Sequence, residues 1–160
     1  MDNYKITNKN EEHYGLQYHD GLNIDPVPFN PSGNCEPGGI YYANKDILAF
    51  LSYGCWLRKV TIPDDAQVYE NPGTPKKYKA DKVILGERIK ITLDVIEGLI
   101  SEGADAKNKE VFRSACEYGC TDIVKILIKY GANAKNEAAF EWACEYGCTD
   151  IVEILKKYNK

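Results

Sequence analysis

Two pairs of cysteines in the last third of the chain have a spacing that could hold a metal ion. Cys116 and Cys120 are four residues apart, and Cys144 and Cys148 repeat this interval. Four thiolates form the ligand set of many structural zinc sites. Both pairs lie in a duplicated segment, however, where one cysteine of each pair takes the small buried position of a helix and the other follows a glycine. Duplication explains the pattern, and we expect no metal site.

The other nucleophilic and metal-binding side chains are isolated along the chain. Cys35 and Cys55 have no histidine close in sequence, so an activated thiolate is not indicated. His13 and His19 lie at the two ends of a predicted strand and could form a metal pair, but two solvent-exposed histidines are the simpler interpretation. We therefore expect no catalytic residues and no enzyme.

A glycine-rich segment suggests one possible nucleotide chemistry. Gly38 to Tyr42 (GGIYY) resembles the G-I-Y-F strand of ADP-ribosyltransferase folds, in which backbone and aromatic groups hold a nicotinamide. That resemblance implies that His13 or His19 would contact a ribose and that Glu87 would orient the attacking group. The alternative is a turn at residues 37–39 before a buried strand. We favour the turn, because a motif this short carries little information, and we expect no cofactor.

The composition is that of a folded, weakly acidic protein. Hydrophobic residues make up 44% and charged residues 28%, which is enough apolar material to form a core. The net charge of −4 gives no general attraction to nucleic acid or to anionic membranes. Residues 1–10 lack the apolar centre of a secretory signal, and no run reaches the roughly 18 apolar residues of a membrane span. We expect an intracellular protein with reduced cysteines.

The C-terminal third contains an internal repeat. Residues 107–132 align without gaps on residues 135–160, with 17 identical positions out of 26 and a period of 28. A partial third copy begins near Asp94 and ends at residues 103–105. The array therefore holds about two and a half units.

Each unit is predicted to contain two helices joined by a tight turn. Apolar residues three to four positions apart form one face of the first helix in each full unit, namely Phe112, Ala115, Cys116, Phe140, Ala143 and Cys144. Gly119 and Gly147 are expected to end these helices, because glycine adopts the left-handed conformation easily. Thr121-Asp122 and Thr149-Asp150 are expected to cap the second helices.

The pattern A-C-x-x-G-x-x-D-I-V-x-I-L-x-x-x-G-A resembles the ankyrin repeat over residues 92–160. That resemblance implies a stack of helical hairpins that binds other proteins. The period is shorter than the usual length of about 33 residues, and the missing residues lie between Ala132 and Phe140, where the β-turn finger would begin. Stacked units bury one another's apolar faces, and about three are normally needed for stability. This array is short of that number.

Residues 1–90 differ in character, because all 7 prolines lie there. We expect four strands, at residues 14–18, 39–42, 56–62 and 82–85, and one helix at residues 44–53. The overall prediction is a small α+β N-terminal domain, residues 1–90, followed by a short all-α ankyrin-type helical repeat array, residues 91–160. We expect the domain to cap the array by covering the apolar residues Leu93, Ile96 and Leu99.

The N-terminal region carries a second resemblance. Phe29 to Tyr42 (FNPSGNCEPGGIYY) is similar to a module, with the pattern C-x-P-G-G-I-Y-Y, that precedes ankyrin repeats in proteins of giant, mimivirus-like DNA viruses. Residues 20–23, 57–63 and 80–85 extend the match. The resemblance implies a viral protein located in the host cytoplasm and implies no catalytic role.

Exposed positions on the first helices are the expected partner-binding surface. They are Arg113, Glu117, Tyr118, Glu141, Glu145 and Tyr146. Tyrosine and arginine are overrepresented among residues that carry interface energy, although a solvated helical face that binds nothing is the alternative. We predict a monomeric protein-protein interaction module that engages a host or viral protein. An ADP-ribosyltransferase-like N-terminal domain and a structural component of the virion remain alternative functions.

Overall fold

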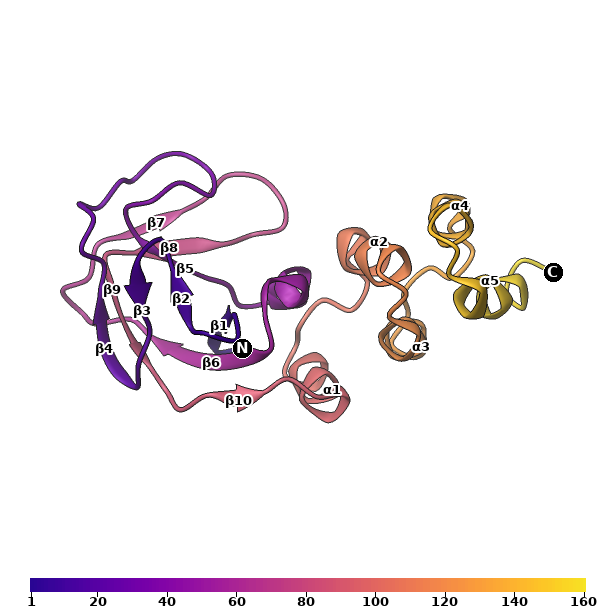
Figure 1. The fold of residues 1–160 in the computed structure, drawn as a ribbon, viewed down its shortest axis with the longest axis horizontal. Coiled ribbons are helices and arrows are strands. Elements are labelled where there is room, and N and C mark those ends of the chain that lie inside the picture. The colour runs from indigo at the N-terminus through magenta and orange to yellow at the C-terminus, as the bar shows by residue number, and fades with distance from the viewer. The chain divides into compact units, whose positions relative to one another are not determined.

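The computed structural model describes residues 1–160, which form two compact units, Met1–Thr92 and Leu93–Lys160. The first unit is rich in strands and the second contains only helices, as the sequence predicts (Figure 1). The strands are β1 (Asn3–Thr7), β2 (Glu12–His13), β3 (Leu16–Gln17), β4 (Gly21–Ile24), β5 (Ile40–Tyr42), β6 (Trp56–Thr61), β7 (Val68–Glu70), β8 (Tyr78–Ala80), β9 (Lys82–Leu85) and β10 (Ile89–Lys90). A 3-10 helix, η1 (Ile47–Tyr53), lies between β5 and β6.

Three antiparallel sheets make up the first unit. The largest has the order β1-β6-β9-β4, and β10 also pairs with β6. A second sheet has the order β5-β8-β7, and β2 forms a hairpin with β3. The pairing of β1 with β6 runs from Asn3 opposite Val60 to Thr7 opposite Trp56, so the first strand is built into the main sheet. Apolar side chains of both larger sheets share one buried cluster, which contains Tyr18, Ile40, Tyr42, Val60, Ala80, Val83 and Leu85.

The expected strands at 39–42, 56–62 and 82–85 are confirmed as β5, β6 and β9. The expected strand at 14–18 is wrong at its start, because Tyr14 and Gly15 form the turn of the β2-β3 hairpin, with φ of 51° and 78°. Two successive residues with positive φ are typical of tight hairpin turns, whose twist matches that of the strands.

The expected helix at 44–53 is shorter and of a different type. It begins at Ile47 as the 3-10 helix η1, and Asp46 before it makes no side-chain capping hydrogen bond. Asn44, the expected cap, instead accepts a hydrogen bond from the backbone of Lys45. Without a side-chain acceptor for its first N–H groups, this short segment takes the tighter helical form that is common in brief connecting pieces.

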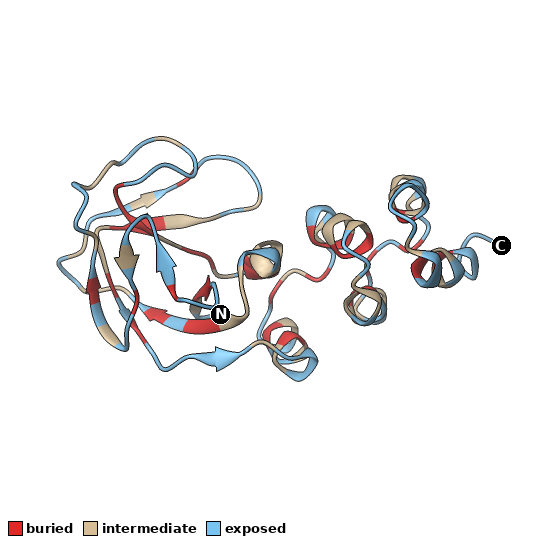
Figure 2. Cartoon of the chain, in the orientation of Figure 1, coloured by how far each residue is buried: buried red, intermediate tan, exposed pale blue.

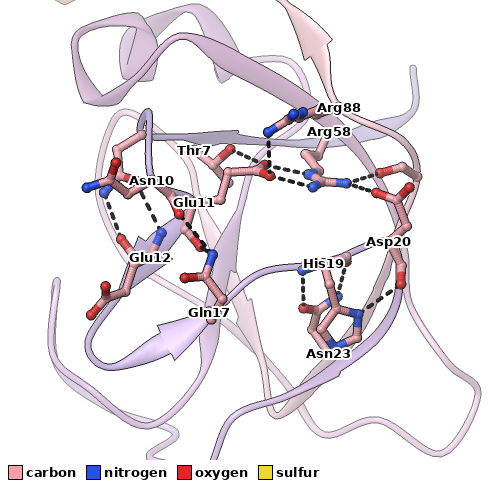
Figure 3. A network of polar contacts seen from close by, with 12 residues as sticks. Thr7, Asn10, Glu11, Glu12, Gln17, His19, Asp20, Asn23, Arg58 and Arg88 are labelled. Atoms are coloured by element: carbon pink, nitrogen blue, oxygen red, sulfur yellow. Dashed lines mark hydrogen bonds and ion pairs between the residues drawn. The ribbon is translucent and has the colours of Figure 1, made fainter.

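A buried ion pair joins β6 of the main sheet to the segment between β1 and β2 (Figure 3). Arg58 of β6 donates two hydrogen bonds of 2.7 Å to Glu11, and their side chains are only 3% and 7% exposed. Arg58 also donates to Asp20 and to the carbonyl of Gly86. The hydrogen bonds from Arg58 hold the pKa of Glu11 below its usual value, and a further bond from Thr7 adds to this effect. Each buried charge in this network therefore has its partner.

The second unit contains α1 (Leu93–Ser101), α2 (Lys109–Glu117), α3 (Thr121–Lys129), α4 (Glu137–Glu145) and α5 (Thr149–Lys156). The first helices of the two full repeats, α2 and α4, pack on each other. The second helices form another row, in which α3 contacts both α1 and α5 (Figure 1). The partial first copy supplies only α1, which corresponds to the second helix of a unit. Two layers of helices result, with the apolar repeat positions between them.

The ends of these helices differ in part from the expectation. Gly119 and Gly147 do follow α2 and α4 in the left-handed conformation, with φ of 68° and 69°. The expected capping of α3 and α5 by Thr-Asp pairs is wrong, since Cys120 and Cys148 occupy the N-cap positions and no side chain caps either helix. Side-chain caps occur on α2 and α4 instead, where asparagine accepts a hydrogen bond from the backbone two residues later. Thr121 and Thr149 are the first residues of α3 and α5, one position too late to act as N-cap residues.

Burial along the array shows how one unit covers the next (Figure 2). Leu127, Ile151 and Leu155 have no exposed surface. Cys116 on α2 is also fully buried, and burial raises the pKa of its thiol to about 12, so that it acts as a small apolar side chain. Cys144, one period later, was expected to be buried but is exposed. The difference arises because Cys116 has Cys148 of the next unit beside it, whereas α4 has no such neighbour.

Candidate functional site

The expected binding residues lie on α2 and α4 and on the residue that follows each helix. Asn108 and Asn136 cap these two helices and hold their first turns. The period of 28 places equivalent positions of the two helices next to each other, since α2 and α4 pack together. Repeat geometry, rather than any single motif, therefore aligns the predicted residues in two rows.

Arg113 is the centre of a small polar cluster on this face. It donates to Glu110 at 2.9 Å and 3.1 Å and to Glu117 at 3.0 Å, and both acids lie on the same helix. Its guanidinium also lies 5.8 Å from the ring centre of Trp142 on α4. The hydrogen bonds that Arg113 donates to Glu110, together with the charge of both acids, raise the pKa of Arg113. The arginine is thus fixed by its own helix and rests against the next unit.

Glu117, at the end of α2, and Tyr146, which follows α4, connect the two full repeats. The charge of Glu117 and its hydrogen bond to the phenol raise the pKa of Tyr146. Tyr146 remains 53% exposed and Tyr118, its equivalent in the preceding unit, is 68% exposed. Large aromatic rings with this much exposed surface are available to a partner without rearrangement of the array.

The structure brings together three of the six predicted residues, namely Arg113, Glu117 and Tyr146. The side chains of Tyr118, Glu141 and Glu145 are exposed and make no hydrogen bond or ion pair. Sequence reasoning missed Glu110 and Trp142, which hold Arg113 in place. The only signal for Trp142 is that it breaks the repeat, because the aligned residue is Ser114.

The structure also places the residues of the two alternative sites, namely the cysteines of a possible metal site and the glycine-rich segment of a possible nucleotide site. All six cysteines are free, and no group of three or more potential metal-binding side chains comes together. Gly38 and Gly39 have positive φ and lead into β5, where Ile40 is 1% exposed. The hydroxyl of Tyr41 donates to the carbonyl of Glu36 and accepts from its N–H. This segment has the geometry of a turn before a core strand.

Paired helices that repeat every 28 residues and share a buried face define a helical repeat protein. The family described as ankyrin repeats in three copies matches residues 89–160. Residues 89–160 therefore belong to the ankyrin-repeat family, and the chain has relatives in Acanthamoeba polyphaga mimivirus. None of its helices combines the length and hydropathy that crossing a lipid bilayer requires.

The relatives are proteins of this giant virus. The chain is 39% identical to ankyrin repeat protein R229 over an aligned stretch of 107 residues, and the match covers 62% of this chain and 35% of R229. It is 35% identical to ankyrin repeat protein R868, over 72% of this chain and 61% of R868. It is 39% identical to the uncharacterized protein R869, over 64% of this chain and 78% of R869. The chain thus covers a third of R229 and about three fifths of R868, and no solved structure matches it.

Proposed function

We propose that this protein binds a protein partner, of the host or of the virus, through the exposed face of α2 and α4. Ankyrin repeats are generally protein-protein interaction modules, and the observation that supports this face is its repeated Glu-Tyr pair. Glu117-Tyr118 and Glu145-Tyr146 recur in register at the ends of neighbouring helices, and both tyrosine rings are more than half exposed. Exposed aromatic residues beside charged groups are typical of interface centres.

The charge on this face indicates the chemistry of the partner. Glu137, Glu141 and Glu145 lie four residues apart on α4, all are exposed, and none forms an ion pair. Like charges at this spacing weaken a helix by a few tenths of a kcal/mol each, roughly. A basic partner surface would offset that repulsion and would associate faster at low ionic strength. We therefore propose that the partner exposes lysine or arginine side chains. We also propose that this protein binds it as a monomer in the host cytoplasm.

Quantitative affinity capture from infected amoebae tests this proposal. The native chain and a Tyr118→Ala/Tyr146→Ala variant are compared, and we expect recovery of the specific partner to fall at least tenfold in the variant. Two matched variants serve as controls: Tyr158→Ala removes another exposed tyrosine of the array, and Tyr118→Phe/Tyr146→Phe keeps both rings. Both should retain most of the partner. Equal recovery by the native chain and the double alanine variant would count against this face.

We further propose that the strand-rich unit is a module shared with the viral relatives. The match to R868 covers 72% of the chain, whereas Leu93–Lys160 accounts for only 68 of the 160 residues. The similarity must therefore extend into the first unit. The C-x-P-G-G-I-Y-Y segment, which includes the turn and the core residue Ile40, is the part that we assign to the module.

We also propose that this module caps the array, because two and a half units are fewer than a repeat stack normally needs. The chain has one tryptophan in each unit, Trp56 and Trp142. In a Trp56→Phe background, fluorescence of Trp142 reports on the array alone. We expect Arg58→Met, which weakens the first unit, to lower the unfolding midpoint of the Trp142 signal by several degrees. An unchanged Trp142 transition in a chain whose first unit has melted would disprove the dependence.

A further inference from the structure

The strand-rich unit contains a cavity that the proposed protein-binding face does not involve. Its volume is about 350 Å³, within the range of sites for small molecules, which starts at roughly 300 Å³. Aromatic side chains from β1, β5, η1 and the β2-β3 hairpin surround it, among them Tyr14, Tyr18, Tyr42 and Phe50. Such a lining favours a flat, largely apolar ligand.

Lys5 places an ammonium group in the wall of this cavity. The residue is only 6% exposed and lies on β1 within the main sheet. Its Nζ donates one hydrogen bond of 2.9 Å to the carbonyl of Tyr41 and lies 4.8 Å from the ring centre of Tyr18. Lys5 forms no ion pair. An ammonium has three N–H donors, so two of them are left for a ligand.

Two phenol groups have the same property. Tyr18 and Tyr42 are 5% and 7% exposed, both line the cavity, and no hydrogen bond to either hydroxyl occurs within the chain. Lys5 and the two phenols, which all line the cavity, therefore present polar groups with unused hydrogen-bonding capacity to a molecule bound there.

The charges around the cavity decide the sign of that molecule. Besides Lys5, the side chain of Lys77 lines it and lies 5.0 Å from the ring centre of Tyr41. His13 also lines it, but burial and then the charge of Lys5 lower the pKa of its imidazole, against a smaller opposing effect of Asp25, so His13 adds little positive charge at neutral pH. The exposed Glu12 is the only carboxylate in the lining. Burial lowers the pKa of Lys5 to about 8, as expected for a cation without a counter-charge. An anionic group beside it would provide the missing charge.

We propose that this cavity binds a small molecule with a planar, apolar body and one anionic group, either a carboxylate or a phosphate. The anionic group pairs with Lys5 and accepts from the hydroxyls of Tyr18 and Tyr42, and the body lies among the aromatic rings. Lys77 at the same wall adds attraction for the negative charge. No residue of the α2-α4 face takes part, so the two proposals stand or fall separately.

Isothermal titration calorimetry on the full chain tests this site with phenyl phosphate and benzoate as probes. Benzyl alcohol retains the ring without the charge, and inorganic phosphate and acetate retain the charge without the ring. We expect at least one aryl anion to bind ten times or more tightly than its uncharged or ring-free counterpart. Comparison of the two aryl anions tells a phosphate site from a carboxylate site.

Variants link the binding to the named residues. Lys5→Met keeps the apolar stem and should weaken binding of the aryl anion at least tenfold without affecting benzyl alcohol, whereas Lys9→Met, an exposed lysine outside the cavity, should change nothing. Tyr18→Phe and Tyr42→Phe preserve both rings and should each weaken binding about threefold, which gives a second test if Lys5→Met disturbs the fold. The proposal fails if neither aryl anion binds the native chain, or if binding survives Lys5→Met unchanged.

Discussion

Replacement of Arg58 by methionine is expected to destabilise the strand-rich unit by about 3–5 kcal/mol, the usual effect of breaking a buried ion pair. Glu11 would keep its burial but lose two short hydrogen bonds, and only Thr7 and the more distant Arg88, at 3.7 Å, would remain to satisfy it. Asp20 and the carbonyl of Gly86 would lose a donor as well. Urea unfolding of the chain with and without Arg58→Met, both in a Trp142→Phe background and followed by Trp56 fluorescence, measures the difference.

An exposed ion pair in the same unit supplies the control. Lys76 and Glu70 are 2.8 Å apart with both side chains more than half exposed, so Lys76→Met should cost less than about 1 kcal/mol. The Arg58 deficit should also shrink in an Arg58→Met/Glu11→Gln double variant, which removes the uncompensated charge. If Arg58→Met and Lys76→Met have equal effects, the ion pair does not stabilise the unit as we describe.

Replacement of Lys5 by methionine is expected to have the opposite effect, because it should raise the free energy of unfolding of the same unit at neutral pH. The ammonium is buried without a carboxylate, and burial lowers its pKa from 10.5 to about 8. This difference corresponds to an unfavourable contribution of about 3 kcal/mol when the lysine is charged in both states. Loss of the hydrogen bond to Tyr41 would cancel about 1 kcal/mol of the gain.

The gain from Lys5→Met depends on pH in a defined direction. Below about pH 8 the lysine is protonated in the folded and unfolded states, and the full penalty is present. Between about pH 8 and 10.5 the unfolded chain holds a proton that the folded chain has released, so native stability rises with pH. The stability difference between Lys5→Met and the native chain should therefore be largest at pH 7 and clearly smaller at pH 9.5.

Urea unfolding at pH 7, 8.5 and 9.5 tests this dependence, with Lys9→Met as the matched variant of an exposed lysine. The raised pKa values of buried tyrosines, such as Tyr42, act equally on all variants and cancel in the differences. A Lys5→Met chain that is less stable than the native chain at pH 7, or a difference that does not vary with pH, would contradict the assignment. A stabilising change that abolishes ligand binding would be typical of a functional group kept at a cost in stability.

The fold of the array was predictable because both full copies of the repeat have the same sequence pattern and indicate the same pair of helices. The duplicated apolar positions, the period of 28 and the glycines at 119 and 147 determined the order and type of the helices. The caps were misassigned because threonine, aspartate and asparagine are all good N-cap residues, and only the position of the glycine turn decides among them. The exposure of Cys144 depends on a missing neighbour, which the repeat pattern does not reveal.

The strand-rich unit was less predictable for a specific physical reason. Two of the strands that were not predicted, β1 and β8, carry buried lysines, Lys5 and Lys79, where an alternating pattern leads one to expect apolar residues. Lys79 has no exposed surface, and its Nζ donates to the carbonyl of Ser32 at 2.8 Å. Long-range contacts decide whether such a lysine is buried. The hydropathy pattern therefore revealed neither these two strands nor the cavity that Lys5 lines.

The affinity of a purified partner for the α2-α4 face tests the central claim most directly. Once capture has identified the partner, calorimetry gives its Kd for the native chain and for the Tyr118→Ala/Tyr146→Ala variant at two salt concentrations. We predict at least a tenfold rise in Kd for the variant, and weaker native binding at the higher salt because the face is acidic. A Kd that is the same for both chains would show that the partner binds elsewhere and would contradict the proposed function.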